Sequence, residues 1–430
     1  MSRTIAFDLS RLLIGPLFRT PRGIDRVDLA LASHIFADAH SPNLGVLPTP
    51  WGVRVFPAAY VVRLLVKLKA LWSESMPEAD DPAIRKLLCA MAGEEAPTAE
   101  PAAGALSYQR RAARMADLLR TLGWQPGRSA VRTIPHGAIY LNVGQLALAV
   151  PRLHTWLDQR PDLTRAIMLH DVIPLEYPHL VPRRAVAHHR RMVGTAARHA
   201  TCLLFTTNYA REGVVQALRT FGRTDVPSFV RALPVPAAFA SVLRSIPELG
   251  GRHYFIVVST IEPRKNHALL IRVWRSLIRR HGAAVPDLVM VGSPGNGSRQ
   301  ILDWASQDPG LRRRIHHVSG LSSPSLAALM LGASATLSPS IVEGFGLPVF
   351  ESLALGVPVI ASDIPAHREL ARADAVLLPP DDDAAWEAAI LQTRPAPIRT
   401  PPAIPTRMTE KGYCEDVLAF LHMSSAHGEA

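Results

Sequence analysis

The residue types best suited to chemistry in this chain are two glutamates eight positions apart, Glu343 and Glu351. The stretch between them reads Gly-Phe-Gly-Leu-Pro-Val-Phe, so glycines and a proline separate the two carboxylates. Pro348 is typical of the first turn of a helix, where its missing N–H costs nothing. After the expected strand 335–338, the pattern predicts Glu343 on a loop and Glu351 one turn inside a helix.

This arrangement suits a ligand that carries both phosphate and hydroxyl groups. Glycines let backbone amides approach a ligand, and a helix N-terminus favours an anion. Each flanking carboxylate can accept hydrogen bonds from hydroxyls. A nucleotide diphosphate sugar has a hexose at one end, a ribose at the other and phosphates between them. The alternative is an ordinary strand–helix turn with a capping carboxylate, because one glycine-rich turn is a weak signal.

A second motif, Thr-Ile-Glu-Pro-Arg-Lys-Asn-His at 260–267, lies between an apolar run at 254–259 and an amphipathic run at 268–278. This is the pattern of a βα unit, and open parallel sheets bind ligands at the strand ends of such units. Lys265 would supply a point charge for a pyrophosphate, and Arg264 could add a planar fork.

Two further motifs lie in the N-terminal half. At 166–174, an apolar strand ends in His170-Asp171, and polar residues at strand ends are candidates for function. Asp171 either orients the imidazole or caps the next turn. At 20–30, Gly23 would let its loop approach a diphosphate, and Arg26 could reach the phosphate or an acceptor. The alternative there is a loop glycine beside a surface ion pair of Asp25 and Arg26.

Together these motifs resemble the retaining glycosyltransferases of GT-B fold, family four, whose signature is Glu-x7-Glu with Gly-Phe-Gly-Leu-Pro inside. The resemblance implies that Glu343 holds hydroxyls of the donor sugar, Glu351 holds the ribose diol and Lys265 contacts the phosphates. Many members carry a further arginine after the strand 254–259, where this chain has Ser259 and Thr260. Arg264 is the candidate replacement, and the alternative is that it simply faces solvent.

The same resemblance extends to the other motifs. A histidine at the place of His170 lies beside the transferred sugar in relatives, and family members carry a glycine followed by Glu/Asp-Arg at the place of Gly23. In relatives, the backbone after the strand 314–318 meets the edge of the base. The predicted catalytic residues are His170, Glu343 and Lys265, and the predicted donor-binding residues are Glu351, Arg264, Gly344, Phe345, Gly346, Leu347, Gly23, Arg26 and Val318.

Short apolar runs that alternate with helical patterns predict an α/β protein with two Rossmann-like domains, whose parallel sheets face each other across a cleft. The first domain, 1–240, would face the acceptor and contain a helical insertion at 51–131. The second, 251–393, would bind the nucleotide sugar, and 394–430 would form a proline-rich linker and a helix that crosses back. Strands are expected at 4–9, 139–143, 165–170, 201–206, 254–259, 287–292, 314–318, 335–338 and 357–361.

Three other segments have weaker signals. The glycine-rich loop 291–297 could lie near phosphate or ribose. The block 362–369 also resembles the family, with a structural role expected. Three consecutive aspartates at 381–383 precede a helical run, which favours helix capping over a metal site. No bound metal is expected, because GT-B enzymes generally neutralise the departing diphosphate with basic residues and helix dipoles.

Composition limits the class of protein. The chain has 430 residues, 48% of them hydrophobic, which is enough for two cores. Three scattered cysteines favour a reducing compartment, and neither a signal peptide nor a membrane span is expected. The formal charge of +11 suits binding to an anionic membrane surface and to donor phosphates. A nucleic-acid partner is not favoured, because the sequence lacks basic stripes interleaved with aromatic residues. A cytoplasmic protein is therefore expected, either cytosolic or peripheral at the inner face of the plasma membrane, without a nucleic-acid partner.

The run 60–72 has a broad apolar face that includes Leu64 and Leu68, with Arg63 and Lys67 opposite. Such a helix either lies in lipid headgroups or packs in a core with solvated basic tips. The core alternative is favoured.

The segment 170–178 and the Gly-Ile-Asp-Arg loop resemble bacterial enzymes of exopolysaccharide, capsule or O-antigen synthesis. The resemblance implies mannose transfer from GDP-mannose to a saccharide or polyprenyl-linked saccharide, with the nucleotide sugar as substrate and no cofactor. A UDP-hexose or dTDP-rhamnose donor is the rival. From another class, a catalytically silent sugar-nucleotide-binding protein could keep both glutamates.

Overall fold

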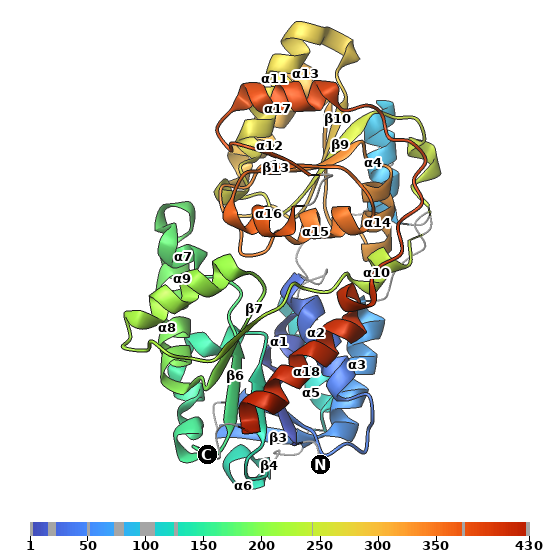
Figure 1. Ribbon diagram of the computed structural model, residues 1–430. Coiled ribbons are helices and arrows are strands. Elements are labelled where there is room, and N and C mark those ends of the chain that lie inside the picture. Colours follow the sequence, from blue (N-terminus) through green and yellow to red (C-terminus); the bar gives the residue numbers. More distant parts are fainter. Residues whose placement is uncertain are drawn as a thin grey trace.

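The computed structural model describes eight stretches of the chain: 3–15, 23–49, 52–72, 81–94, 108–123, 128–242, 244–371 and 375–426. They form two α/β domains, with the N-terminal domain below the C-terminal domain in Figure 1. This confirms the predicted α/β architecture of two domains.

The N-terminal domain is built on an eight-stranded sheet in the order β4-β3-β2-β1-β5-β6-β7-β8. Its strands are β1 Ile5–Asp8, β2 Leu44–Thr49, β3 Gly52–Pro57, β4 Arg128–Ser129, β5 Ile139–Asn142, β6 Thr164–Met168, β7 Cys202–Phe205 and β8 Ser228–Val230. Its helices are α1 Ser10–Ile14, α2 Gly23–Ile35, α3 Ala58–Trp72, α5 Tyr108–Thr121, α6 Ala130–Thr133, α7 Ile173–Glu176, α8 Arg183–His199 and α9 Asn208–Arg219. All strand pairs are parallel except β2–β3 and β3–β4.

The C-terminal domain contains a parallel six-stranded sheet in the order β11-β10-β9-β12-β13-β14. Its strands are β9 Tyr254–Val258, β10 Asp287–Val291, β11 Ile315–Val318, β12 Ala335–Ser338, β13 Val359–Ser362 and β14 Ala375–Leu378. Its helices are α11 His267–His281, α12 Ser298–Gln307, α13 Pro309–Arg312, α14 Ser323–Leu331, α15 Leu347–Ala354, α16 Pro365–Leu370 and α17 Asp383–Gln392. Apolar residues of α11 and α17 pack on one face of the sheet, and those of α14 and α15 pack on the other.

The structure confirms the nine expected strands with small shifts at their ends, but the description of 51–131 as a helical insertion was wrong in part. β3 and β4 lie in this segment and extend the first sheet by antiparallel pairing. β2, β8 and β14 were not expected either. β2 contains Pro48, which argues against a strand when only the sequence is read.

One helix of the same segment, α4 Pro82–Ala92, lies on the C-terminal domain, beside α14 in Figure 1. The Asp81 carboxylate caps α4 through the amide of Ala83 (2.9 Å) and also accepts the amide of Ser322 (3.0 Å) just before α14. Arg252 donates to the carbonyl of Met91 at 2.7 Å. α4 therefore ties the N-terminal half of the sequence to the second domain.

The connections between the domains follow the expected path. The stretch after β8 contains the short helix α10 Ala237–Ala240 and leads to β9, and residues 394–405 contain no regular element. The last helix, α18 Glu410–Ala426, returns to pack on α2, and Asp416 pairs with Arg231 at 2.8 Å. All three cysteines are free. Within the described residues, no helix combines the length and apolar character needed to span a bilayer.

Helix α3 belongs to the core, as the favoured alternative predicted. Val61, Leu64, Leu65 and Leu68 are at most 4% exposed and pack with apolar residues of the first domain. On the outer side of the helix, Lys67 pairs with Asp117 of α5 at 2.5 Å. The apolar stripe is therefore covered by protein.

Shortening a side chain in this stripe should destabilise the fold. Leu64→Ala removes a fully buried side chain and should lower the free energy of unfolding by about 2–5 kcal/mol. Val66→Ala, on the same helix but 63% exposed, should change it by less than about 0.5 kcal/mol. Urea denaturation measures both. Similar small losses for the two variants would contradict a core role for α3.

Candidate active site

The loop between β12 and α15 carries the two glutamates as predicted. Glu343 lies on the loop, Gly346 is the N-cap of α15, Pro348 stands in its first turn and Glu351 follows one turn in. Both carboxylates are buried, with 7% and 2% of the residues exposed. The β12–β9 pair is where the strand order of the second sheet reverses, a place where open sheets bind ligands.

Two glycines of this loop are needed for different reasons. Gly346 has a φ of +91°, a left-handed conformation that strains other residues. Gly344 has no room for a side chain, because a Cβ there would lie 2.9 Å from the carbonyl oxygen of His170. Between them, Phe345 packs edge-on against Phe350, with ring centroids 5.4 Å apart.

Glu343 lies between cations from the turn after β9. The Nζ of Lys265 donates to one carboxylate oxygen, and the Arg264 guanidinium donates to the other at 3.1 Å. Ser340 adds a hydroxyl at 2.7 Å. Burial would raise the pKa of Glu343, but the two cations outweigh it and hold this pKa well below its ordinary value. Glu343 is therefore a fixed carboxylate.

Arg264 also pairs with Glu262 at 2.7 Å, so it lies in the cluster of charges and does not simply face solvent. At the place of that arginine, the Ser259 hydroxyl lies 3.2 Å from Nε2 of His267. The structure therefore brings Lys265, Arg264 and Glu343 together in one buried cluster.

Glu351 is bound by the other domain. Arg26 of α2 donates to its carboxylate at 3.0 Å and to the Ser323 hydroxyl at 2.9 Å. Burial raises the pKa of Glu351 to about 7, and Arg26 offsets only part of this effect. The alternative of an Asp25–Arg26 surface pair was wrong, because Asp25 is buried and pairs with Arg11 at 2.5 Å.

Gly23 also meets the glutamate loop, since a Cβ on it would lie 2.8 Å from a methyl carbon of Leu347. Residues 20–22 of the same motif lie outside the described residues. Helix α2 of the N-terminal domain therefore starts directly against the loop predicted to bind phosphate.

His170 reaches the same loop from the end of β6, through the close approach of its carbonyl to Gly344. Its Nε2 lies 3.1 Å from the carbonyl of Val143. A carbonyl only accepts, so the proton is on Nε2. Burial lowers the pKa of His170 to about 4, which keeps the imidazole neutral at pH 7. Asp171 accepts the amide of Ile173 at 3.1 Å, which is the capping alternative.

Sequence reasoning missed a set of contacts between the domains. The Thr207 hydroxyl donates to the carbonyl of Gly344 at 2.7 Å. Glu369 of α16 accepts the amides of Asn208 (2.8 Å) and Tyr209 (2.7 Å), so it caps α9 of the other domain. The signals were a Thr-Asn pair after a strand and a glutamate in a block predicted to be structural. Neither signal reveals a partner 137 to 161 positions away.

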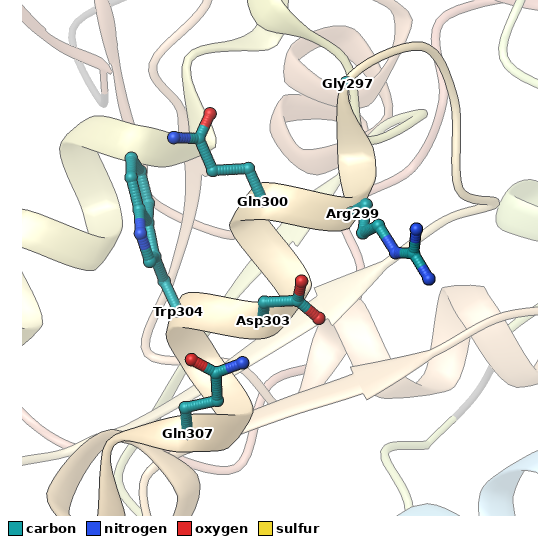
Figure 2. A pocket seen from close by; sticks show the side chains of 6 residues that line it. All are labelled: Gly297, Arg299, Gln300, Asp303, Trp304 and Gln307. Carbon is teal, nitrogen blue, oxygen red and sulfur yellow. The ribbon is translucent and has the colours of Figure 1, made fainter.

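The segments expected near the nucleotide are Val318 and the glycine-rich loop 291–297. Val318 ends the edge strand β11, and its carbonyl accepts the amide of Gly292 at 3.0 Å. The glycine-rich loop 291–297 packs on the turn after β9, where a Cβ on Gly295 would lie 2.9 Å from the Ile261 carbonyl. Where this loop ends, α12 carries a surface pocket lined by residues of that helix (Figure 2). Its lining residues are Gly297, Arg299, Gln300, Asp303, Trp304 and Gln307.

The aspartates at 381–383 act as expected for a helix start. Asp382 caps α17 through the amide of Ala385 at 3.0 Å, and Asp383 pairs with Arg272 at 2.7 Å. Among the described side chains, no group of three or more His, Cys, Asp or Glu is placed to hold a metal ion.

Comparison with known proteins bears on the whole chain. Residues 242–394 match the family described as Glycosyl transferases group 1. The C-terminal domain is therefore similar to group 1 glycosyl transferases. The chain is 25% identical over 238 residues to O-antigen chain mannosyltransferase B of Escherichia coli, which covers 54% of this chain and 61% of that protein. It is 33% identical over 121 residues to the mannosyltransferase WbdA of the same species, which covers 28% of this chain and 15% of WbdA.

Solved structures confirm the GT-B fold over nearly the full length. HepE of Anabaena, in complex with UDP and glucose, superposes with a TM-score of 0.56 at 14% identity and 99% coverage of both chains. Trehalose 6-phosphate synthase of Burkholderia multivorans gives 0.57 at 12% identity and full coverage of both. This fold, together with the group 1 match, confirms the predicted resemblance to a GT-B glycosyltransferase of the family-four type.

The Glu369 cap should hold the two GT-B domains together. Glu369→Ala removes a carboxylate from a helix N-terminus and should weaken the closed arrangement by about 1–2 kcal/mol. Small-angle scattering should then show a larger radius of gyration. Arg368→Ala is the control, because among the described residues Arg368 pairs with Asp363 of its own domain, at 2.5 Å, and with none of the other domain. Identical scattering from both variants would contradict the interdomain role.

The raised pKa of Glu351 predicts a pH effect. Its folded pKa of about 7 exceeds the ordinary 4.5, so its contribution to stability is full below about pH 4.5 and is lost as pH rises through 7. Relative to wild type, Glu351→Gln should therefore gain up to about 3 kcal/mol of unfolding free energy towards alkaline pH. Chemical denaturation at a series of pH values measures this gain. Parallel profiles for the two proteins would show that Glu351 has no raised pKa.

Proposed function

We propose that the protein is a retaining glycosyltransferase that moves a hexose from a nucleotide sugar to a saccharide acceptor. The observation that carries this proposal is the placement of Glu343 and Glu351 at the two ends of one glycine-rich loop. Each is buried and has cationic partners, and these partners come from both domains.

The loop would hold the diphosphate. Within the described residues, no hydrogen bond occupies the amides of Gly344–Leu347, and the N-terminus of α15 adds a favourable dipole. Lys265 and Arg264 lie at one end of this loop and Arg26 at the other. Departure of a diphosphate leaves negative charge on it, and fixed cations and amides stabilise that charge as it develops.

The two carboxylates would bind the hydroxyl groups on either side of the phosphates. Glu343 stays ionised because of its cations, so it can accept hydrogen bonds from the donor hexose. Glu351 would accept the ribose diol, and Arg26, its present partner, would turn towards the phosphates. This exchange replaces one set of charge-assisted hydrogen bonds with another.

His170 would form the wall beside the transferred sugar. Its neutral imidazole donates a hydrogen bond from Nε2–H to the Val143 carbonyl. The ring would therefore position the sugar and would not act as a general acid at neutral pH. We infer that the leaving phosphate accepts the acceptor's proton while the acceptor attacks from the same face. The C1–O bond to phosphate breaks as the new bond to C1 forms, and the anomeric configuration is retained.

For the donor we propose GDP-mannose, and for the acceptor a growing or lipid-linked saccharide of bacterial surface polysaccharide. Supporting relatives include mannosyltransferase B, WbdA and O-antigen chain mannosyltransferase RfbU of Salmonella typhimurium, which is 24% identical over 53% of this chain and 60% of its own length. The reaction would take place at the cytoplasmic face of the plasma membrane, without a cofactor or a metal ion. A UDP-hexose is the rival donor, since HepE has been crystallised with UDP-glucose.

A panel of GDP-, UDP- and dTDP-sugars tests the donor. The correct donor should raise the melting temperature, and Glu343→Ala should remove both this rise and sugar transfer, with a loss of transfer of at least about 100-fold. Glu262→Ala is the matched control, because Glu262 pairs with the same Arg264 but is a more exposed neighbour of the cluster. It should keep donor binding and most of the activity.

Three outcomes would decide against parts of the proposal. Donor binding without transfer or hydrolysis would indicate a silent sugar-nucleotide-binding protein. A product with inverted anomeric configuration would rule out the retaining reaction. Equal activity in Glu343→Ala and wild type would show that the Glu343 cluster is not the active site.

A further inference from the structure

One stretch of the N-terminal domain carries a large excess of positive charge. Residues 183–223 contain eight arginines and a single acidic residue, Glu212, so they carry +7 of the formal +11. This stretch consists of α8, β7, α9 and the turn that follows. Helices α8 and α9 lie side by side at the outer edge of the N-terminal domain (Figure 1).

The arginines of α8 share one face. At 100° per residue, Arg183, Arg184, Arg190, Arg191 and Arg198 fall within an arc of about 120°. All five are exposed, while the opposite face, with Met192, Val193 and Ala196, is buried. This arginine face extends along the helix for about 22 Å.

Most of these charges have no partner in the protein. Arg198 pairs with Asp158 at 2.8 Å, and among the residues described here the other four form no ion pair. α8 itself contains no acidic residue. Uncompensated like charges repel one another, so an anionic partner would relieve an unfavourable arrangement.

An apolar side chain lies in the middle of this face. Phe221, after α9, is 43% exposed, and its ring lies 3.0 Å from the position that a Cβ on Gly194 would take. Gly194 falls within the arc of the arginines, and Ala187 adds a second small residue there. An exposed phenyl ring thus lies against the same helix face as the arginines.

We propose that the arginine face of α8, with Phe221, docks the protein on an anionic phospholipid bilayer. Guanidinium groups would pair with lipid phosphates, and the Phe221 ring would enter the headgroup layer. The earlier candidate for membrane contact, residues 60–72, has its apolar stripe buried in the core, so the membrane surface moves to α8.

A bilayer fits this face better than a nucleic acid does. The face is straight, with small residues between the arginines, and it combines charge with one apolar anchor. Single-stranded nucleic acid would require aromatic platforms in a basic groove, and this convex face offers a single ring. α8 begins after the segment that follows His170, so its first arginines lie towards the edge of the sheet that holds the candidate site.

Vesicle sedimentation tests the proposal with the full chain and without donor or acceptor, so the result does not depend on the proposed transfer reaction. The protein should sediment with vesicles containing phosphatidylglycerol, remain in solution with pure phosphatidylcholine, and dissociate as salt rises. Arg190→Ala/Arg191→Ala should lower the affinity about 20- to 30-fold, from about fivefold per arginine. Phe221→Ala should lower it several-fold more.

The matched control is Arg312→Ala/Arg313→Ala, which removes the same charge from two exposed residues of the C-terminal domain. This variant should bind vesicles like the wild type. Equal losses of vesicle affinity in the two double variants would show that only net charge matters. This result would overturn the assignment of the arginine face as the docking surface. Failure to bind anionic vesicles, or binding to single-stranded DNA in preference to them, would overturn the proposal as well. Circular dichroism confirms that each variant is folded.

Discussion

Glu343 can remain a buried carboxylate only because Lys265 and Arg264 lie against it. Without them, desolvation would cost several kcal/mol or force the acid to take up a proton. The fold supplies these cations through topology. β9 and β12 are neighbours in the sheet, so the turn after β9 meets the loop after β12, and the amide of Ile341 donates to the carbonyl of Arg264 at 2.8 Å.

The second acid of the site couples the two domains. Glu351 belongs to the C-terminal domain, and its cation, Arg26, belongs to the N-terminal domain. Thr207, Glu369 and the close approach of Gly344 to His170 add contacts across the same boundary. Ligand binding between the domains would therefore act on charges that also hold the domains together. A ligand shifts such an equilibrium only as far as it binds one arrangement better than the other.

The sequence was informative where function depends on local pattern. Strand runs, the Pro348 helix start and the two acids of one loop are spaced by short-range rules, and the structure has them as predicted. Contacts between distant segments could not be predicted in this way. Whether Arg26 pairs with Asp25 or Glu351 depends on how two domains meet. The hairpin of β2 and β3 was missed because Pro48 weakens a strand signal that antiparallel pairing overrides.

The most direct test of the central claim is a crystal structure of the protein with GDP-mannose, or with whichever sugar nucleotide binds. We expect hexose hydroxyls within hydrogen-bond distance of Glu343, ribose hydroxyls on Glu351 and the diphosphate on the amides of Gly344–Leu347. The claim would be contradicted if the nucleotide sugar touched neither carboxylate and both stayed paired with their present basic partners.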